Sequence, residues 1–566
     1  MKLKGLPQRV YNVYFHTHTV AGIAISFGLF IIFYCGAFSL FRDDIYRWEN
    51  PEARFETPRT VDLDRAMAAI QAAEPGLAET AQLTFRLPDE KNPYLRFFGA
   101  VYRDDSCEKT KRIRGVVKTE ENYAFTNYEN PKTTLSNTIY RLHYLGQLPA
   151  GLYLSGFIAV FFLFASVTGV MIHWRNIVTK FYAFTVRGKW KQIWANAHTV
   201  LGMIGLPFQI IYAVTGALFG LLFLLLLPSA FVLFGGDTNK VLATVRPDAA
   251  LSTDKNAPFS AYPSIQAPYQ HTVATFPGYH ITSVRLRNYG REDGLMTINL
   301  DDEQTISGTG DISYALSTGE VLGKTDPRHK TYTQSVLSAV TKLHFASFGG
   351  LLLRIIYFVL AMITCFMILS GVLLWRAARD NKRYTDRQKR FHHRVTKGYL
   401  AICLGLFPAT ALIFIANKAI PLHWMGRATY VNAIFFLGRL GLFAAGLFWN
   451  DFRRLNKNYL RIGGVLALLV PLANGLVTGD WFWRAFARQQ WYVGSVDLAW
   501  LMTGLAALTL VWLLPSAGAA PPPRQRGAAA PKRGTTSVRG RHKVAPTVYQ
   551  RCSTWFGWSK SEVLGD

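Results

Sequence analysis

Long runs of apolar residues alternate with two long polar segments along this chain. Eight of the runs approach or exceed the roughly 20 residues that a helix needs to cross a bilayer. They occupy residues 20–41, 148–172, 200–234, 351–375, 398–416, 431–449, 462–477 and 498–514. The polar segments 42–142 and 235–343 are each long enough to hold a small folded domain. The pattern therefore predicts an all-α polytopic membrane protein with two small extramembrane α+β domains.

The composition agrees with a membrane protein and excludes several soluble classes. The 566 residues include 62 Lys and Arg and 35 Asp and Glu, for a net charge of +27. However, 50% of the residues are hydrophobic, 14% are aromatic and only 17% are charged. A soluble nucleic-acid binder would be richer in charge, and a disordered chain would be poorer in aromatic residues. Five cysteines are also too few for a disulfide scaffold of this length.

The positive charge indicates how the chain crosses the membrane. Basic residues gather before the first run, and again in loops 173–199, 376–397 and 450–461, whereas the loops between them are poorer in Lys and Arg. Because positive loops stay in the cytoplasm, we expect both termini to be cytoplasmic and both polar segments to lie on the opposite side of the membrane. The first run is too long for a cleaved signal peptide, so we expect it to be retained.

These boundaries divide the chain into seven parts. They are 1–41 (N-terminus and first helix), 42–142 (first outer domain), 143–234 (second and third helices), 235–343 (second outer domain), 344–397 (fourth helix and basic loop), 398–514 (four further helices) and 515–566 (tail). The tail is rich in Ala, Pro, Gly and Arg, which predicts a disordered, cytoplasmic segment.

The first four helices contain an internal repeat. The segment HTVAG at 18–22 recurs as HTVLG at 198–202, and LHY at 142–144 parallels LHF at 343–345. The core is therefore two copies of one unit. In each copy, one helix has a histidine at its cytoplasmic start, an outer domain follows, and a second helix has a histidine at its outer start.

A two-fold axis between the copies would place His18 opposite His198 at the inner face and His143 opposite His344 at the outer face. Neutral imidazole is a common axial ligand of haem iron, and two facing histidines can hold a porphyrin inside a helical bundle. The repeat therefore predicts two bis-histidine haem sites, with these four residues as ligands to iron. A polar residue that only marks the membrane interface is the alternative for each histidine.

Four repeated glycines fit the same arrangement. Gly36 and Gly216 fall near the outer site, and Gly169 and Gly371 fall near the inner one, because each helix would carry a ligand at one face and a small residue at the other. A flat macrocycle needs such clearance. Close packing between helices is the alternative explanation for small residues in membrane helices.

Other polar residues compete for these roles. They are His16, His173, His392, His393, His423 and Arg354. His16 and His173 lie near the inner site and are the reserve ligands. His392 and His393 open the fifth helix, where they face phosphate or solvent, and His423 lies on an outer loop. Arg354 would pair with a haem propionate or reach the membrane interface.

The motifs resemble those of the PepSY-associated transmembrane proteins, which include inner-membrane ferric-siderophore reductases and iron-regulated membrane proteins. The resemblance covers about residues 10–400 and rests on the paired H-x-x-x-G starts, the L-H-[FY] openings and the [ST]-G pairs ending at Gly169, Gly216 and Gly371. Segments 61–70 and 314–322 are similar to the helix and the strand–turn–strand of a PepSY module. Cys35 before Gly36 departs from the family's Thr-Gly, and the first outer segment lacks a Thr-Gly-Glu turn.

The resemblance implies two small PepSY-like periplasmic domains, two haem b groups per chain, and electron transfer to a ferric siderophore in the periplasm. The sequence has no C-x-x-C-H motif, so covalent haem attachment is not expected. The five cysteines, Cys35, Cys107, Cys365, Cys403 and Cys552, form no cluster with metal-ligand spacing. The cytoplasmic loops are too short for a flavin or nicotinamide domain, so a quinol or a separate cytoplasmic reductase would supply the electrons.

Two other functions stay open at this stage. One is a sensor or regulator whose PepSY-like domains bind a protease or peptide, and the other is a siderophore permease. The helices after residue 398 would hold a quinol site, dock a partner or buttress the bundle, of which we favour the last. Membrane lipid is an expected partner and nucleic acid is not.

Overall fold

A computed structural model describes most of the chain. It covers residues 7–51, 54, 61–88, 95–102, 110–119, 122–127, 135–176, 179, 190–302, 305–422, 424–449 and 451–514. Several residues and segments considered above, namely Cys107, His423, Cys552 and the 515–566 tail, lie outside these ranges.

The described residues contain eight helices that are long and apolar enough to cross a membrane, as predicted. They are α1 (Gln8–Ser39), α5 (Gly151–His173), α8 (Leu206–Phe234), α12 (Gly350–Arg379), the α13–α14 pair (Asp386–Leu404 and Leu406–Ala419), α15 (Arg427–Phe448), α16 (Phe452–Thr478) and α18 (Trp491–Leu513). The chain is therefore a mostly helical, multi-pass membrane protein.

Two of the spans contain a break that hydropathy did not reveal. Helix α7 (Trp190–Ile204) is separated from α8 at Gly205, and α13 is separated from α14 at Gly405. Each break is followed within three residues by a proline, Pro207 or Pro408. Proline lacks the N–H that would continue the helical hydrogen bonds, so it favours the first turn of a new helix.

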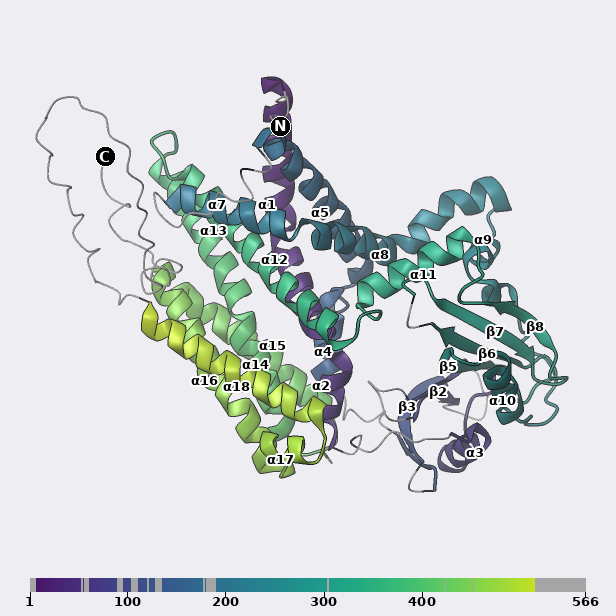
Figure 1. Ribbon diagram of the computed structural model, residues 1–566. Helices are drawn as coiled ribbons and strands as arrows, with labels where there is room; N and C mark the ends of the chain where they lie inside the picture. The colour runs from purple at the N-terminus through teal and green to yellow at the C-terminus, as the bar shows by residue number, and fades with distance from the viewer. Residues whose placement is uncertain are drawn as a thin grey trace, which may run out of the picture.

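The first four spans form one bundle. Helix α1 packs against α5 and α12, while α7 packs against α12 and α8 against α5. We call the end of this bundle near Ser39 the sheet end, because α2 (Arg42–Glu49) and the sheet follow there, and the end near Gln8 the far end (Figure 1).

His143 and His344 do not begin membrane helices, which corrects the expectation above. Each lies near the C-terminal end of a separate short helix, α4 (Leu135–His143) or α11 (Tyr332–Phe345). Left-handed residues follow both helices, Leu145 with φ 56° and Ala346 with φ 50°, and such a conformation ends a helix. A short turn then leads into α5 or α12.

The two polar segments build one sheet and not two separate domains. Strands β1 (Leu83–Arg86) to β4 (Ala124–Asn127) come from the first segment, and β5 (His280–Arg287) to β8 (Val321–Thr325) come from the second. All neighbours are antiparallel, in the order β4-β3-β2-β1-β5-β6-β7-β8. The pairing of β1 with β5 joins the halves, and helices α3 (Leu63–Ala73) and α10 (Gln266–Thr275) contribute to one shared core.

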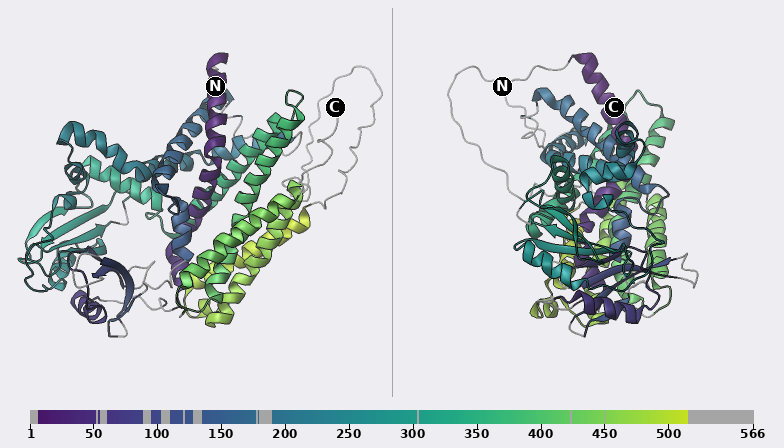
Figure 2. Two further views of the ribbon diagram at one scale, coloured as in Figure 1. Left: turned by 180° about the vertical axis from the view of Figure 1, so that it is seen from behind. Right: turned by 90° about the vertical axis from the view of Figure 1, so that its right-hand side faces the viewer.

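The intervening strands are β2 (Leu95–Tyr102), β3 (Thr110–Lys118), β6 (Leu295–Asp301) and β7 (Thr309–Ala315). The predicted turn between β7 and β8 is present, with Gly319 at φ +74°. In the first half, Asn122 and Tyr123 adopt left-handed φ values of 53° and 65° in the turn between β3 and β4, where the Thr-Gly-Glu motif is missing. Helix α9 (Thr238–Val245) connects α8 to the second half of the sheet (Figures 1 and 2).

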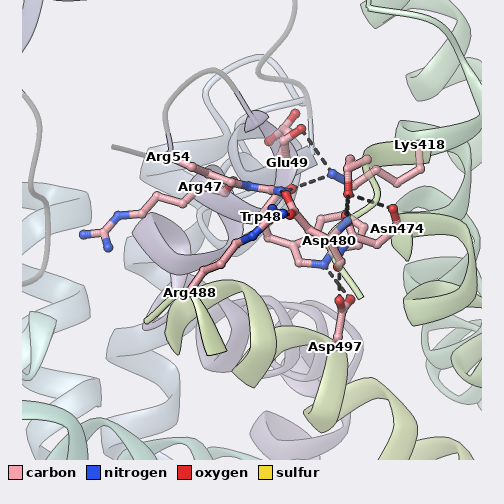
Figure 3. Close-up of polar contacts among 10 residues, drawn as sticks. Arg47, Trp48, Glu49, Arg54, Lys418, Asn474, Asp480, Arg488 and Asp497 are labelled. Carbon is pink, nitrogen blue, oxygen red and sulfur yellow. Dashed lines mark hydrogen bonds and ion pairs between the residues drawn. The ribbon is translucent and has the colours of Figure 1, made fainter. Parts of the chain in front are cut away.

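The C-terminal helices attach to the bundle through a buried polar cluster at the sheet end (Figure 3). Trp48 of α2 donates from Nε1 to Asp497 Oδ1 of α18 at 2.7 Å, and Asn474 of α16 donates to the other oxygen of that carboxylate at 2.8 Å. Arg54 forms an ion pair with Asp480 at 2.5 Å, and its side chain is only 2% exposed. The segment that follows α1 is thus fixed to the C-terminal helices α16 and α18.

One residue of this cluster anchors α4. The carboxylate of Glu49 accepts from the backbone N–H of Leu135 and Ser136, at 2.8 and 3.2 Å, and from the Asn417 amide of α14 at 3.0 Å. An anionic group at a helix N-terminus satisfies its free N–H groups and complements its dipole. Thr138 also donates to Asn432 of α15 at 2.7 Å. The C-terminal helices therefore brace the helix that carries His143.

Candidate functional site

The structure brings together the histidines that the repeat pairs. At the far end, His18 of α1 and His198 of α7 have ring centroids 6.1 Å apart. At the sheet end, His143 and His344 have ring centroids 6.0 Å apart. We call these the far-end pair and the sheet-end pair. Each consists of one histidine from each copy of the repeat.

Three of the four imidazoles are held by the same contact. The Nδ1 atoms of His18, His143 and His198 lie 2.8 to 2.9 Å from the backbone carbonyl oxygens of Ala165, Ile32 and Met367, respectively. A carbonyl can only accept a hydrogen bond, so Nδ1 carries the proton in each ring. The lone pair then lies on Nε2, which forms no hydrogen bond with the described residues. This tautomer is the one that a metal-binding histidine adopts when a carbonyl orients it.

The fourth imidazole, that of His344, is held in the same tautomer by a side chain. Thr215 Oγ1 lies 2.9 Å from Nδ1 of His344 and donates its own proton to the carbonyl of Ile211 at 2.7 Å. The hydroxyl is therefore the acceptor for His344. Tyr212 also donates to the His344 carbonyl at 3.1 Å. The Thr of the Thr-Gly motif is thus a direct partner of a candidate ligand, which the sequence did not reveal.

Three of the four repeated glycines leave room for these imidazole rings to pack against the helix backbone. A Cβ at Gly36, Gly169 or Gly371 would lie 2.8 to 3.1 Å from the imidazole of His143, His18 or His198, respectively. No side chain fits at those separations without moving the ring. The clearance therefore admits the imidazole ring, and clearance for a macrocycle stays a prediction.

Gly216 differs from the other three glycines. A Cβ there would meet the Cβ of Ala159 at 3.4 Å, which is ordinary van der Waals contact between helices. Helix packing, the alternative given above, describes this position better than clearance for a ring.

The spacing of each pair suits one metal ion between the two rings. A bond from a metal to an imidazole nitrogen is about 2 Å long, and the nitrogen lies about 1 Å from the ring centre, so two opposed ligands have centroids about 6 Å apart. The donor set also fits, because two neutral nitrogens with fixed tautomers are suitable axial ligands for haem iron. Burial, with the neighbouring His143 as a smaller cause, lowers the pKa of His344 to about 3, so its ring is neutral at pH 7. Burial also lowers the pKa of His143.

Helix α1 links the two pairs. His18 and Ile32, whose carbonyl holds His143, are separated by 14 residues of this helix, or about 21 Å. Aromatic rings fill the bundle next to the sheet-end pair: Tyr212 lies 5.2 Å from His344 and 4.5 Å from Phe208, measured between centroids. Phe33 of α1 contacts both of these aromatic rings.

The reserve candidates occupy other positions. His16 is exposed at the far end, beside Phe15. His173 lies near the far-end pair, with Nε2 3.4 Å from Thr199 Oγ1. His392 and His393 instead pack against aromatic rings, those of Trp375 and Phe452.

Two further expectations concern charge and metal. Arg354 pairs with Asp44 of α2 at 2.9 Å, a partner that sequence reasoning did not consider. Within the described part of the chain, no group of three or more His, Cys, Asp or Glu side chains is arranged to hold a metal ion. Cys35, Cys365 and Cys403 are buried free thiols. Each histidine pair has two members and is therefore not a group of this kind.

Comparison with known proteins gives two matches. The model of the family described as "PepSY-associated TM region" matches residues 15–378, which include both histidine pairs and the sheet. An uncharacterized protein of Pseudomonas aeruginosa is 24% identical over 348 residues, which cover 58% of this chain and 82% of the relative.

Proposed function

The chain belongs to the family of PepSY-associated transmembrane proteins, and we propose that it is a dihaem b electron-transfer protein that reduces ferric siderophores outside the bacterial inner membrane. In this proposal both termini are cytoplasmic and the sheet is periplasmic. The observation that carries the proposal is the pair of facing histidines at each end of one bundle, each with Nδ1 held by an acceptor.

The residues of the chain have distinct tasks. His18 and His198 would hold one haem, and His143 and His344 would hold the other. Bound haem supplies a one-electron Fe(III)/Fe(II) couple at each pair. Ala165, Ile32, Met367 and Thr215 fix the tautomers through Nδ1, which keeps every Nε2 available as a ligand. The glycines at 36, 169 and 371 let the rings approach the helix backbone.

In this proposal the direction of transfer is toward the sheet. With haem bound, electrons would enter at the far-end pair and leave from the sheet-end pair, next to the sheet. The substrate Fe(III) takes one electron and becomes Fe(II), a softer ion that hydroxamate or catecholate oxygens bind less well. The iron is therefore released without any change in the chelator. The eight-stranded sheet shapes the surface at which the chelate docks.

Transfer of electrons to a ferric chelate tests the proposal. The purified full chain is reduced with dithionite, freed of excess reductant and mixed anaerobically with a ferric hydroxamate and a coloured Fe(II) chelator. We expect about two Fe(II) per chain, one for each haem, as the haem bands return to the oxidised form. A His143→Ala/His344→Ala variant is the control and should react at least tenfold more slowly. A native protein that releases no Fe(II) would exclude the reductase and favour the regulator or permease.

A further inference from the structure

An arginine lies inside the membrane-spanning part of α15, apart from both histidine pairs. Arg439 is 12 residues from the first residue of α15 and 9 from its last, which corresponds to about 18 and 13 Å along the helix. Helical side chains tilt toward the N-terminus of their helix, so the guanidinium is directed away from the nearer end. Charged residues at such depth are rare in membrane helices and commonly mark a functional site.

The guanidinium has no ionic partner among the described residues. Arg439 forms no hydrogen bond or ion pair with them, and the thiols of Cys35 and Cys403 lie near it. Buried Arg427, in contrast, donates to the carbonyl oxygens of Ile420 and Asn417. The donors of Arg439 are therefore available to a ligand, and a guanidinium offers five of them.

Arg439 lines a groove of about 960 Å³ between α1, α5, α15 and the end of α4. Apolar and aromatic side chains form most of its wall, and Thr17, His16 and Gln147 are its other polar side chains, at the two ends. Phe27, Phe157 and Phe161 on this wall are 41 to 50% exposed, so the groove opens sideways toward lipid. A ligand can enter it from the bilayer.

The groove extends along α1 from the level of one histidine pair to that of the other, and none of the four histidines lines it. Its lining includes Thr17, next to His18, and Leu142, next to His143. An occupant would therefore lie along the same helix that connects the two candidate haem sites. A redox-active occupant would be well placed to exchange electrons with them.

The depth of Arg439 in the bilayer determines which membrane molecule can bind in the groove. A phospholipid keeps its phosphate in the headgroup region, outside a hydrocarbon core about 30 Å thick, and its acyl chains offer no acceptor to a guanidinium. A prenylated quinone combines a hydrocarbon tail with two ring oxygens that accept hydrogen bonds within the core. Its ring can also stack on a guanidinium or a phenyl ring. We propose that this groove binds a prenylated quinol, with Arg439 at the ring oxygens, and that the quinol is the electron donor of the reductase.

The role of the quinol as electron donor rests on the proposed function, whereas the binding site does not. One quinol gives up two electrons and two protons as it becomes the quinone. Each electron reduces one Fe(III) chelate to Fe(II), and both protons go to water. The positive charge of Arg439 favours deprotonation of the ring hydroxyl because it stabilises the oxyanion.

Binding of decylubiquinone to the purified full chain, measured by isothermal titration calorimetry, tests the site without reference to haem. Arg439→Gln should weaken binding at least tenfold. Ala24→Trp, which fills the groove and leaves Arg439 in place, should do the same. The matched control is Arg454→Gln, an exposed arginine of α16 that should bind as the native protein does. Equal affinity of the native protein and Arg439→Gln would overturn the proposal, as would loss of co-purified phosphatidylglycerol without any effect on the quinone.

A second readout separates this inference from the proposed function. Decylubiquinol should reduce the haem bands of Arg439→Gln at least tenfold more slowly than those of the native protein, whereas dithionite should reduce both completely. Equal rates with the quinol would overturn the donor role. A protein without haem that still binds the quinone through Arg439 would retain the quinone site and lose the reductase.

Discussion

His198 donates from Nδ1 to the carbonyl oxygen of Met367 at 2.9 Å, four residues before the glycine against which its ring lies. His18 and His143 make the same contact in α5 and α1. The motif is thus a histidine on one helix that fits over a glycine on another and is held by the carbonyl one turn earlier. This relationship explains why histidine and glycine recur together in both copies of the repeat.

The fit of His198 over Gly371 predicts a local effect of substitution there. A Cβ would lie 2.9 Å from Cε1 of the ring, so Gly371→Val should displace His198, break its bond to Met367 and lower the haem content at the far-end pair. Overpacking of this kind costs about 1 to 3 kcal/mol. Haem per chain and thermal unfolding measure the two effects. The control is Gly22→Val in α1, where a Cβ meets nothing within 4 Å; equal loss in both variants would show that the contact is irrelevant.

Thr215 gives a test of how His344 is oriented. Thr215→Val keeps the shape of the side chain and removes the acceptor for Nδ1, so haem affinity at the sheet-end pair should fall about 10- to 100-fold. Titration of the haem-free protein with haemin measures this affinity. Thr364→Val is the matched control because Thr364 bonds only to the Leu360 carbonyl of its own helix. A Thr215→Val variant with native affinity would refute the orienting role.

Glu49 tests the bracing of α4 by the C-terminal helices. Glu49→Ala leaves the N–H groups of Leu135 and Ser136 and the amide of Asn417 without their acceptor. Each buried donor without a partner costs about 1 to 3 kcal/mol, so we expect a loss of at least about 2 kcal/mol and weaker haem retention at the sheet-end pair. Chemical unfolding and haem content report the two results. Glu320→Ala, at an exposed turn, should change neither; retention of full haem content by Glu49→Ala would limit its role to stability.

Asp311 should make the stability of the sheet depend on pH. Burial, together with the charge of Asp248, raises the pKa of the Asp311 carboxyl to about 6, against about 3.9 in an unfolded chain. The folded state then binds a proton more tightly, so stability falls as the pH rises from about 4 to 6. Asp311→Asn should be more stable than the native protein at pH 8, by an amount on the order of 2 kcal/mol, and nearly equal at pH 4. Unfolding at both pH values measures the difference; an identical difference at pH 4 and 8 would contradict the assignment.

Hydropathy and the internal repeat predicted much of this fold. The eight spans were correct because the length of an apolar run is set by the thickness of the bilayer. The repeat also paired His18 with His198 and His143 with His344, which lie together because repeated sequences form equivalent helices. Both inferences depend on local patterns that are visible along the chain.

The features that sequence reasoning missed depend on contacts between distant residues. The pairing of β1 with β5 unites two segments that the second and third spans separate, and no local pattern records a partner at that distance. The hydrogen bonds that Trp48 donates to Asp497 and Asn417 donates to Glu49 also join residues far apart in the sequence. The helix breaks at Gly205 and Gly405 were accessible in principle, because a proline follows each glycine.

The four histidines make the account testable one site at a time. Either His143→Ala or His344→Ala should remove one haem and leave the far-end pair filled, and His18→Ala or His198→Ala should do the reverse. His271→Ala, in helix α10 beside the sheet, is the control that should leave both haems in place. If both haems survive all four single changes, the ligands lie elsewhere, and His16 and His173 are the next candidates.

If each histidine pair holds one haem b, the absorption spectrum of the purified native chain should show it. We expect a b-type spectrum after reduction with dithionite and about two haems per chain, one for each histidine pair. A colourless protein, or one that does not take up added haemin, would contradict it.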